Sequence, residues 1–264
     1  MPVTPSPVSR SAIVTRLRSA GCVFAEDEAE VLISAAGTPA ELTAMVDRRA
    51  SGLPLEQVVG WAGFCGLRIA VDPGVFVPRR RTEFLVRQAI ALAPPRPVIV
   101  DLCCGSGAVG AALAAALDPA ELYATDIDPG AVRCARRNLA AAGGHVYSGD
   151  LFGSLPAALH GRVDILAANV PYVPAGEVAL LPAEARLHEP RVALDGGGDG
   201  LDVLRRVAAQ APLWLAPGGS LLVEISERQE PQACDTTRRG GLVPRVARSA
   251  ELAVAVLIAG KPAG

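Results

Sequence analysis

The chain has 264 residues, half of them hydrophobic, so it is long enough for one large domain and a small one, and its composition excludes a disordered protein. With 25 basic and 27 acidic residues, its formal net charge is −2, a field too weak to recruit nucleic acid by itself. The six cysteines form no CxxC pair and share no metal-ligand spacing with the three histidines. We therefore expect free thiols and no metal site.

No signal peptide is expected, because the opening MPVTPSPVSR lacks a charged start followed by an apolar core. The most apolar segment, ELAVAVLIAG, is about half as long as the ~20 residues that a membrane span needs. Both observations predict a soluble, cytoplasmic protein without a membrane partner.

Helices are expected over residues 8–50, where apolar residues recur with amphipathic spacing and Thr38-Pro39 has the form of an N-cap followed by a first-turn proline. Short β-rich runs punctuated by glycine then indicate a hairpin over residues 58–78. The organisation expected from these patterns is a small helical N-terminal domain at 1–57, a β-hairpin linker at 58–81 and a main domain at 82–264.

In the main domain, strands alternate with helices. Helices are expected at residues 82–93, 108–117, 129–143 and near 200–212, and strands at 98–103, 122–128, 145–150, 163–170 and 220–226. Two further strand-like runs in residues 243–260 predict an antiparallel pair that closes the sheet edge. The alternation predicts an α/β fold with a mostly parallel, seven-stranded sheet covered on both faces.

The first of these strands runs into a glycine-rich turn, DLCCGSGAVG, at residues 101–110. Ligands of open α/β sheets bind at the carboxyl ends of the strands, and Gly105 and Gly107 let the backbone turn tightly and approach a ligand. Asp101 is well placed to receive an amino group. The turn lacks a GxGxxG pattern and no GK[ST] follows, which disfavours binding of a mononucleotide phosphate.

The next two strands end in carboxylates. Asp126 suits the two hydroxyls of an adenosine ribose, and Asp150 is placed to accept from the adenine amino group, with Leu151 packed on the ring. A glycine-rich turn or a strand-end aspartate alone is often purely structural, but three such features on successive strands favour an adenosine-containing cofactor. NAD and S-adenosylmethionine both remain, and the C-terminal strand pair and the DLCCGSG turn favour the methyl donor.

A fourth strand, VDILAA, leads into Asn169-Val170-Pro171-Tyr172. An amide nitrogen is a poor nucleophile, so its methylation requires the lone pair to point at the methyl group from roughly 3–3.5 Å. The side-chain oxygen of Asn169 and the carbonyl of Val170 can accept its two N–H bonds, and Pro171 keeps Val170 extended. Tyr172 offers an aromatic face on which a planar amide or base stacks. The segment also has a purely structural interpretation, as a strand end made of turn residues.

The motifs D-L-x-x-G-S-G, T-D-I-D-P-G-A-V, G-D-L-F and N-x-P-Y, in this order and spacing, resemble those of class I S-adenosylmethionine-dependent methyltransferases, whose fold is Rossmann-like. Residues 53–86 and 188–207 further resemble the linker hairpin and the post-catalytic loop of the protein-(glutamine-N5) methyltransferases that modify release factors. The resemblance covers about residues 50–226. It implies S-adenosylmethionine as donor, the glutamine of a release factor's Gly-Gly-Gln loop as acceptor, and an N-terminal domain for substrate recognition.

Residue chemistry and the resemblance together give the candidate site. The candidate cofactor-binding residues are Asp101, Cys103, Cys104, Gly105, Ser106, Gly107, Asp126, Asp150, Leu151 and Asn169. The candidate catalytic residues are Asn169, Pro171 and Tyr172. The candidate substrate-binding residues are Asn169, Val170, Pro171, Tyr172, Glu189 and Pro190, the last two either contacting the substrate or shaping the loop.

The chain departs from the family pattern at three places, which indicates a divergent branch. Cys103-Cys104 stand where the family has Gly-Thr, so the backbone there is less permissive, and Val170 replaces a proline. Residues 227–241 contain Pro231 and turn-forming residues where the family has a regular helix.

Three other features have weaker interpretations. The basic run VPRRRTE, residues 77–83, is either a solvated helix start, or a surface that meets ribosome-bound or RNA-associated partners, or part of the acceptor groove. Glu224 is expected at a strand end near the site, and Asp199-Gly200 is interpreted as a helix N-cap.

Other functions fit parts of the pattern. The same Asn-x-Pro-aromatic loop presents amino groups of nucleic-acid bases, but the slightly acidic charge and the absence of a target-recognition domain argue against direct sequence-specific nucleic-acid binding. A small-molecule methyltransferase and a non-catalytic S-adenosylmethionine-binding protein remain as alternatives.

Overall fold

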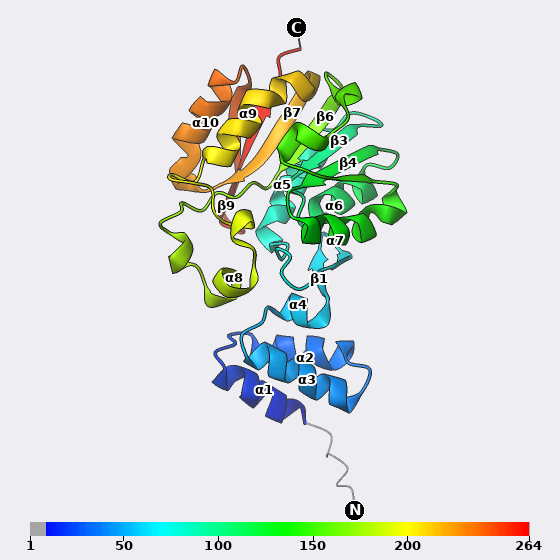
Figure 1. The fold of residues 1–264 in the computed structure, drawn as a ribbon, viewed down its shortest axis with the longest axis vertical. Helices are drawn as coiled ribbons and strands as arrows, with labels where there is room; N and C mark the ends of the chain where they lie inside the picture. The colour runs from blue at the N-terminus through cyan, green and yellow to red at the C-terminus, as the bar shows by residue number, and fades with distance from the viewer. Residues whose placement is uncertain (1–8, 264) are drawn as a thin grey trace, which may run out of the picture.

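The computed structural model describes residues 9–263, so the start of the expected helical segment, at residue 8, lies outside the described residues. The described chain opens with α1 (Arg10–Ser19), α2 (Ala25–Ala35), α3 (Pro39–Ala50) and the short α4 (Leu55–Val59). Thr38 caps α3 as expected: its side chain accepts from the backbone N–H of Glu41, and Pro39 lies in the first turn. Figure 1 shows α1, α2 and α3 packed together at one end of the molecule, away from the sheet.

These helices enclose a hydrophobic core of their own. Ile13 and Leu17 of α1, Leu32 of α2 and Val46 of α3 are buried against one another. Apolar residues at helical spacing therefore build a packing unit that is distinct from the core of the sheet.

A two-stranded antiparallel hairpin, β1 (Trp61–Phe64) and β2 (Leu67–Ala70), follows α4 and confirms the expected hairpin. Its turn consists of Cys65 and Gly66, both with positive φ. The chain then runs through the 3₁₀ turn Arg80–Thr82 into α5 (Glu83–Leu92). The domain boundaries at residues 57 and 81 stay predictions.

The main sheet has seven strands, as the sequence predicted, in the order β5-β4-β3-β6-β7-β9-β8. They are β3 (Val98–Leu102), β4 (Glu121–Asp126), β5 (His145–Ser148), β6 (Val163–Ala168), β7 (Leu215–Ile225), β8 (Val243–Ser249) and β9 (Val254–Gly260). The first five strands in this order are parallel, and β9 runs antiparallel to both β7 and β8. The expected antiparallel pair therefore closes one edge.

Helices cover both faces of this sheet (Figure 1). One face packs against α5, α6 (Ala108–Ala116) and α7 (Pro129–Leu139), and the other against α9 (Asp202–Trp214) and α10 (Glu230–Arg239). Every residue of β3 is buried, because this central strand has helices on both sides. No helix among residues 9–263 is long and apolar enough to cross a membrane. The cytoplasmic location stays a prediction.

Two local expectations were wrong. Residues 230–239 form a regular helix, α10, because Pro231 occupies its first turn, where a missing N–H costs nothing. The N-cap of α9 is Leu201, not Asp199. The carboxylate of Asp199 instead accepts from the Leu201 N–H and pairs with Arg205.

The strand order places two chain segments side by side. After β3 the chain moves outward through β4 and β5, and it then returns to form β6 on the other side of β3. Leu102, at the end of β3, is in register with Ala168, at the end of β6. The glycine-rich turn and the Asn169 segment therefore leave the sheet at the same edge, at a topological switch point.

Candidate active site

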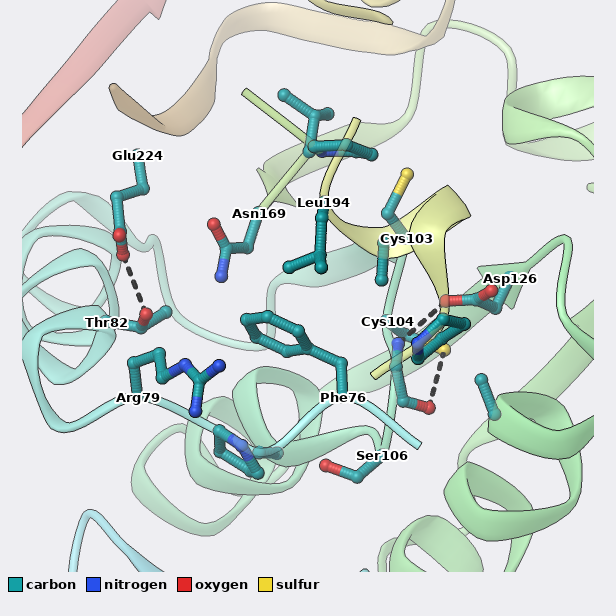
Figure 2. Close-up of a pocket in the computed structure, with 18 of the residues that line it drawn as sticks. Phe76, Arg79, Thr82, Cys103, Cys104, Ser106, Asp126, Asn169, Leu194 and Glu224 are labelled. Carbon is teal, nitrogen blue, oxygen red and sulfur yellow. Dashed lines mark hydrogen bonds between the residues drawn. The ribbon is translucent and has the colours of Figure 1, made fainter. Parts of the chain in front are cut away.

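A cavity of about 370 Å³ opens at this edge, a size in the range of small-molecule sites. Its walls are the turn after β3, the end of β4, residues 169–173, the linker segment 76–82 and the loop around the short helix α8 (Ala183–His188). Figure 2 shows Asp126 and the turn of residues 103–106 at one end of the cavity, with Asn169, Thr82 and Glu224 at the other.

The glycine-rich turn depends on left-handed backbone. Gly105 and Gly107 have φ of 55° and 79°, and Cys103, at 54°, holds a conformation that a residue with a Cβ rarely adopts. A Cβ at Gly107 would lie 3.2 Å from Ala135 and Leu139 on α7, so only glycine allows this close helix packing. The backbone at Cys103 is thus strained, in agreement with the less permissive backbone expected there.

Asp126 holds the turn in place. Its carboxylate accepts from the backbone N–H of Gly105 at 2.8 Å (Figure 2) and from that of Asp128 at 2.9 Å. Burial raises the pKa of Asp126, while these two N–H groups lower it. Each carboxylate oxygen can accept a second bond, so Asp126 can fix the turn and still meet a hydroxyl in the cavity.

Asp101 lies at the bottom of the cavity and is almost fully buried. One oxygen accepts from the Gly110 N–H, and the other accepts no bond from the described residues. Burial raises the pKa of Asp101 to about 7, and the charge of Asp126 adds to this shift. A ligand cation beside this carboxylate would find an acceptor without a competing partner.

Two expected adenine contacts do not line the cavity. Asp150 forms an ion pair of 2.5 Å with Arg206 of α9, and Leu151 is buried in the core. Gly107 does not line the cavity either and packs closely against α7, and its cofactor role stays a prediction. Ile127 does line the cavity and is half exposed. The cofactor roles of Asp150 and Leu151 stay predictions.

Asn169 follows β6 directly. Its Oδ1 atom is inaccessible to solvent and has no hydrogen-bond partner among residues 9–263. A buried polar atom without a partner costs free energy, and of the three such side-chain atoms among residues 9–263 only this one belongs to a residue that lines the cavity. Val170 is buried, packs into the sheet core and borders the cavity, which explains why an aliphatic side chain serves in place of a proline.

Tyr172 lines the cavity within a polar network that the sequence did not reveal. Its hydroxyl donates to Glu224 at 2.9 Å and accepts from Arg81 at 2.6 Å. Glu224 also accepts from Arg81 Nε at 2.8 Å and from Thr82 Oγ1 at 2.7 Å. Burial raises the pKa of Tyr172, and the charge of Glu224 raises it further, so the phenol is neutral and able to donate.

Glu189 and Pro190, the neighbouring pair expected near the substrate, differ in their positions. Pro190 lines the cavity, whereas the Glu189 carboxylate lies behind the wall and accepts from the Val77 N–H at 3.2 Å and from Arg79 at 2.5 Å. Burial raises the pKa of Glu189, and the charge of Arg79 opposes this rise. These contacts of Glu189 favour a role in shaping the loop. Its role as a substrate-binding residue stays a prediction.

Sequence reasoning missed most of the wall that comes from the linker. Phe76, Arg79 and Arg81 line the cavity, as does Leu194 from the far loop (Figure 2 labels the first two and the last). The only available signal was the dense basic run at residues 77–83. Arg79 and Arg81 line the cavity, although the Arg81 side chain is also 46% exposed, and Arg80 is exposed without lining the cavity. The interpretation of this run as a surface for ribosome-bound or RNA-associated partners stays a prediction.

Comparisons with known proteins agree with this geometry. Residues 66–206 match the family model of the methyltransferase small domain. The chain is 41% identical over 192 residues to the release factor glutamine methyltransferase of Geobacter sulfurreducens, which covers 71% of this chain and 66% of the relative. It is 36% identical over 253 residues to that of Cereibacter sphaeroides, covering 88% of this chain and 89% of the relative.

Another relative has a different name. The 4-amino-L-phenylalanine/4-methylamino-L-phenylalanine methyltransferase of Streptomyces pristinaespiralis is 36% identical over 223 residues, covering 81% of this chain and 75% of the relative. A solved methyltransferase from Pyrococcus furiosus has a similar fold, with a TM-score of 0.56 at 18% identity, covering 75% of this chain and 90% of that one.

The fold, the cavity at the switch point and the matching family model define a class I S-adenosylmethionine-dependent methyltransferase. This confirms the methyl donor as cofactor, in preference to NAD. Within that class, the chain belongs to the release factor glutamine methyltransferase family.

Proposed function

We propose that this enzyme transfers a methyl group from S-adenosylmethionine to the side-chain amide nitrogen of a glutamine in the Gly-Gly-Gln loop of a peptide chain release factor. The observation that carries the proposal is Asn169, a cavity-lining residue whose buried Oδ1 has no hydrogen-bond partner among residues 9–263, in an Asn-x-Pro-Tyr segment at the end of a parallel strand. The names of the relatives supply the acceptor.

The residues at the donor end fit S-adenosylmethionine. When bound, it supplies an electrophilic methyl group on a sulfonium. Asp101 would receive its amino group, because this carboxylate has an open oxygen and burial raises its pKa, so that a bound cation would stabilise its charged form. Asp126 would meet the ribose hydroxyls, and the left-handed turn at Gly105 lets the backbone come close.

At the acceptor end, the chain orients an amide rather than deprotonating it. The Asn169 oxygen and the Val170 carbonyl accept the two N–H bonds, so the nitrogen lone pair is aimed across the cavity. The ring of Tyr172 stacks on the planar amide and tolerates positive charge on the nitrogen. The proposal therefore assigns no residue as an initial base.

A protein acceptor is supported by the surface beside the cavity. Leu180 and Leu187, in the loop that carries α8, are 80% and 63% exposed, and Val192 at the cavity wall is 49% exposed. Exposed apolar side chains beside a cavity are typical of a protein contact. We further propose that the helices of residues 1–57 take part in recognising the substrate, because Arg49 of α3 forms an ion pair with Glu184 of α8. The expected absence of sequence-specific nucleic-acid binding stays a prediction.

The second candidate is an arylamine on a small amino acid, favoured by the Streptomyces pristinaespiralis relative. A planar aromatic amine presents a nitrogen to the same two acceptors. The two candidates differ in size: only the protein substrate uses the exposed apolar loop.

One experiment separates these acceptors. The purified enzyme is incubated with donor labelled in the methyl group and, in separate reactions, with a release factor carrying Gln or Ala in the Gly-Gly-Gln loop, or with 4-amino-L-phenylalanine. We expect label only in the Gln protein. Equal labelling of both release factors, or labelling of the small amino acid alone, would contradict the proposal.

A further inference from the structure

The hydroxyl of Tyr172 and the carboxylate of Glu224 lie 52 residues apart in sequence and share a hydrogen bond of 2.9 Å. Glu224 is on β7, an interior strand of the sheet, and is 1% exposed, so its position is set by a rigid strand. Tyr172 is on the loop after β6. The bond therefore ties a loop residue of the acceptor site to the sheet.

Arg81, on the linker segment, contacts both Tyr172 and Glu224. Its Nε donates to Glu224 and its Nη2 donates to the Tyr172 hydroxyl, so one guanidinium bridges both groups. A planar fork of donors holds two acceptors in a fixed geometry, which an ammonium cannot do. A buried carboxylate such as Glu224 requires a paired cation, and Arg81 is its ion-pair partner among the described residues.

The backbone of Tyr172 is fixed independently. The side-chain nitrogen of Gln229 donates to the Tyr172 carbonyl at 2.9 Å and to the Asp199 carbonyl at 3.0 Å. Backbone and hydroxyl are thus held by different elements. The ring between them can adopt few orientations, although the residue lies on a loop.

From these contacts we propose that Arg81 and Glu224 are positioning residues for methyl transfer: together they hold the Tyr172 ring at the angle at which the acceptor amide stacks on it. The inference rests on the proposed function, because it concerns the same acceptor site. It assigns no proton transfer to either residue. The network acts through geometry, to which transfer rates are sensitive, since about 1 Å of misplacement costs roughly a hundredfold in rate.

The test is a double-mutant cycle on kcat for release-factor methylation, with Tyr172→Phe, Arg81→Gln and the double variant. Tyr172→Phe keeps the ring and removes one oxygen, so it is the variant least able to disturb folding. Each single change is expected to lower kcat about ten- to a hundredfold, and the double variant to fall within about threefold of the worse single. Arg81→Lys should recover only part of the loss, because it lacks the fork.

Two measurements separate positioning from a general structural defect. Affinity for S-adenosylhomocysteine should change less than about threefold in every variant, because the donor end has no contact with the network. Arg80→Gln is the matched control: Arg80 is exposed and makes no side-chain hydrogen bond or ion pair with the described residues, so its kcat should equal that of the parent.

An unchanged kcat in Tyr172→Phe would overturn the inference, as would effects of the two single changes that multiply in the double variant. A parent enzyme that methylates no release factor would contradict the proposed function instead, so the two failures are distinguishable.

Discussion

The carboxylate of Asp101 and the backbone N–H of Gly110 form a hydrogen bond of 2.8 Å that joins the end of β3 to the first turns of α6. A Cβ at Gly110 would stand 3.1 Å from the same oxygen, so a larger residue at this position would crowd the bond. This single N–H does not offset the burial of Asp101, whose pKa is raised to about 7.

Donor binding is therefore expected to depend on pH. Because the pKa is raised, the free enzyme holds a proton on Asp101 below pH 7 and must lose it to pair with the donor's amino group. Affinity for S-adenosylhomocysteine should fall roughly tenfold from pH 8 to pH 6, with uptake of protons by the buffer at the lower pH. Isothermal titration calorimetry in buffers of different ionisation enthalpy measures both effects.

Asp101→Asn is the control for this prediction. It should bind more weakly, without the Asp101-linked proton release. Parent enzyme with the same affinity across this pH range would contradict the assignment of Asp101 to the amino group.

Arg49 is expected to be essential for the stability of the N-terminal helices. It is buried and pairs with Glu28 of α2 at 2.6 Å and with Glu184 of α8 at 2.6 Å. Arg49→Met should lower the free energy of unfolding by about 3–5 kcal/mol, because Glu28 is left buried without its cation. Arg16→Met breaks the exposed pair with Asp47 and should cost less than about 1 kcal/mol.

Urea denaturation of the two variants compares these costs directly. If the two variants lose the same free energy of unfolding, the buried ion pairs of Arg49 contribute no more to stability than the exposed pair of Arg16, which would contradict the prediction.

Replacing Val170 by proline should leave the enzyme active. The Val170 N–H donates to no group in the described residues, so proline removes no hydrogen bond, and the carbonyl that we propose as an acceptor-site contact remains. We expect kcat for release-factor methylation within about threefold of the parent value. A tenfold loss with an unchanged melting temperature would instead assign a role to the Val170 N–H or side chain.

Local sequence patterns predicted the sheet, the glycine-rich turn and the Asn-x-Pro-Tyr segment, because each depends on residues close together in the chain. Pro231 misled because a proline at a helix start looks in sequence like a helix breaker, although the first turn tolerates it. The ion pair of Asp150 with Arg206 joins residues that are 56 positions apart, so no local pattern indicates it.

The acceptor network was beyond sequence reasoning for the same reason. Arg81 and Glu224 are 143 residues apart, and only the fold of the linker over the end of β7 brings them together. Each was noticed singly, as part of a basic run and as a strand-end acid. Their pairing across the cavity is a tertiary property that no local pattern indicates.

The most direct test of the account is the rate at which Asn169→Ala methylates the Gly-Gly-Gln glutamine, measured beside its affinity for S-adenosylhomocysteine. We predict a loss of rate of roughly a hundredfold or more, with donor affinity changed less than about tenfold, because the variant keeps the donor turn and loses the oxygen that orients the amide. If the Asn169→Ala variant methylates the release factor at the rate of the parent enzyme, the account is contradicted.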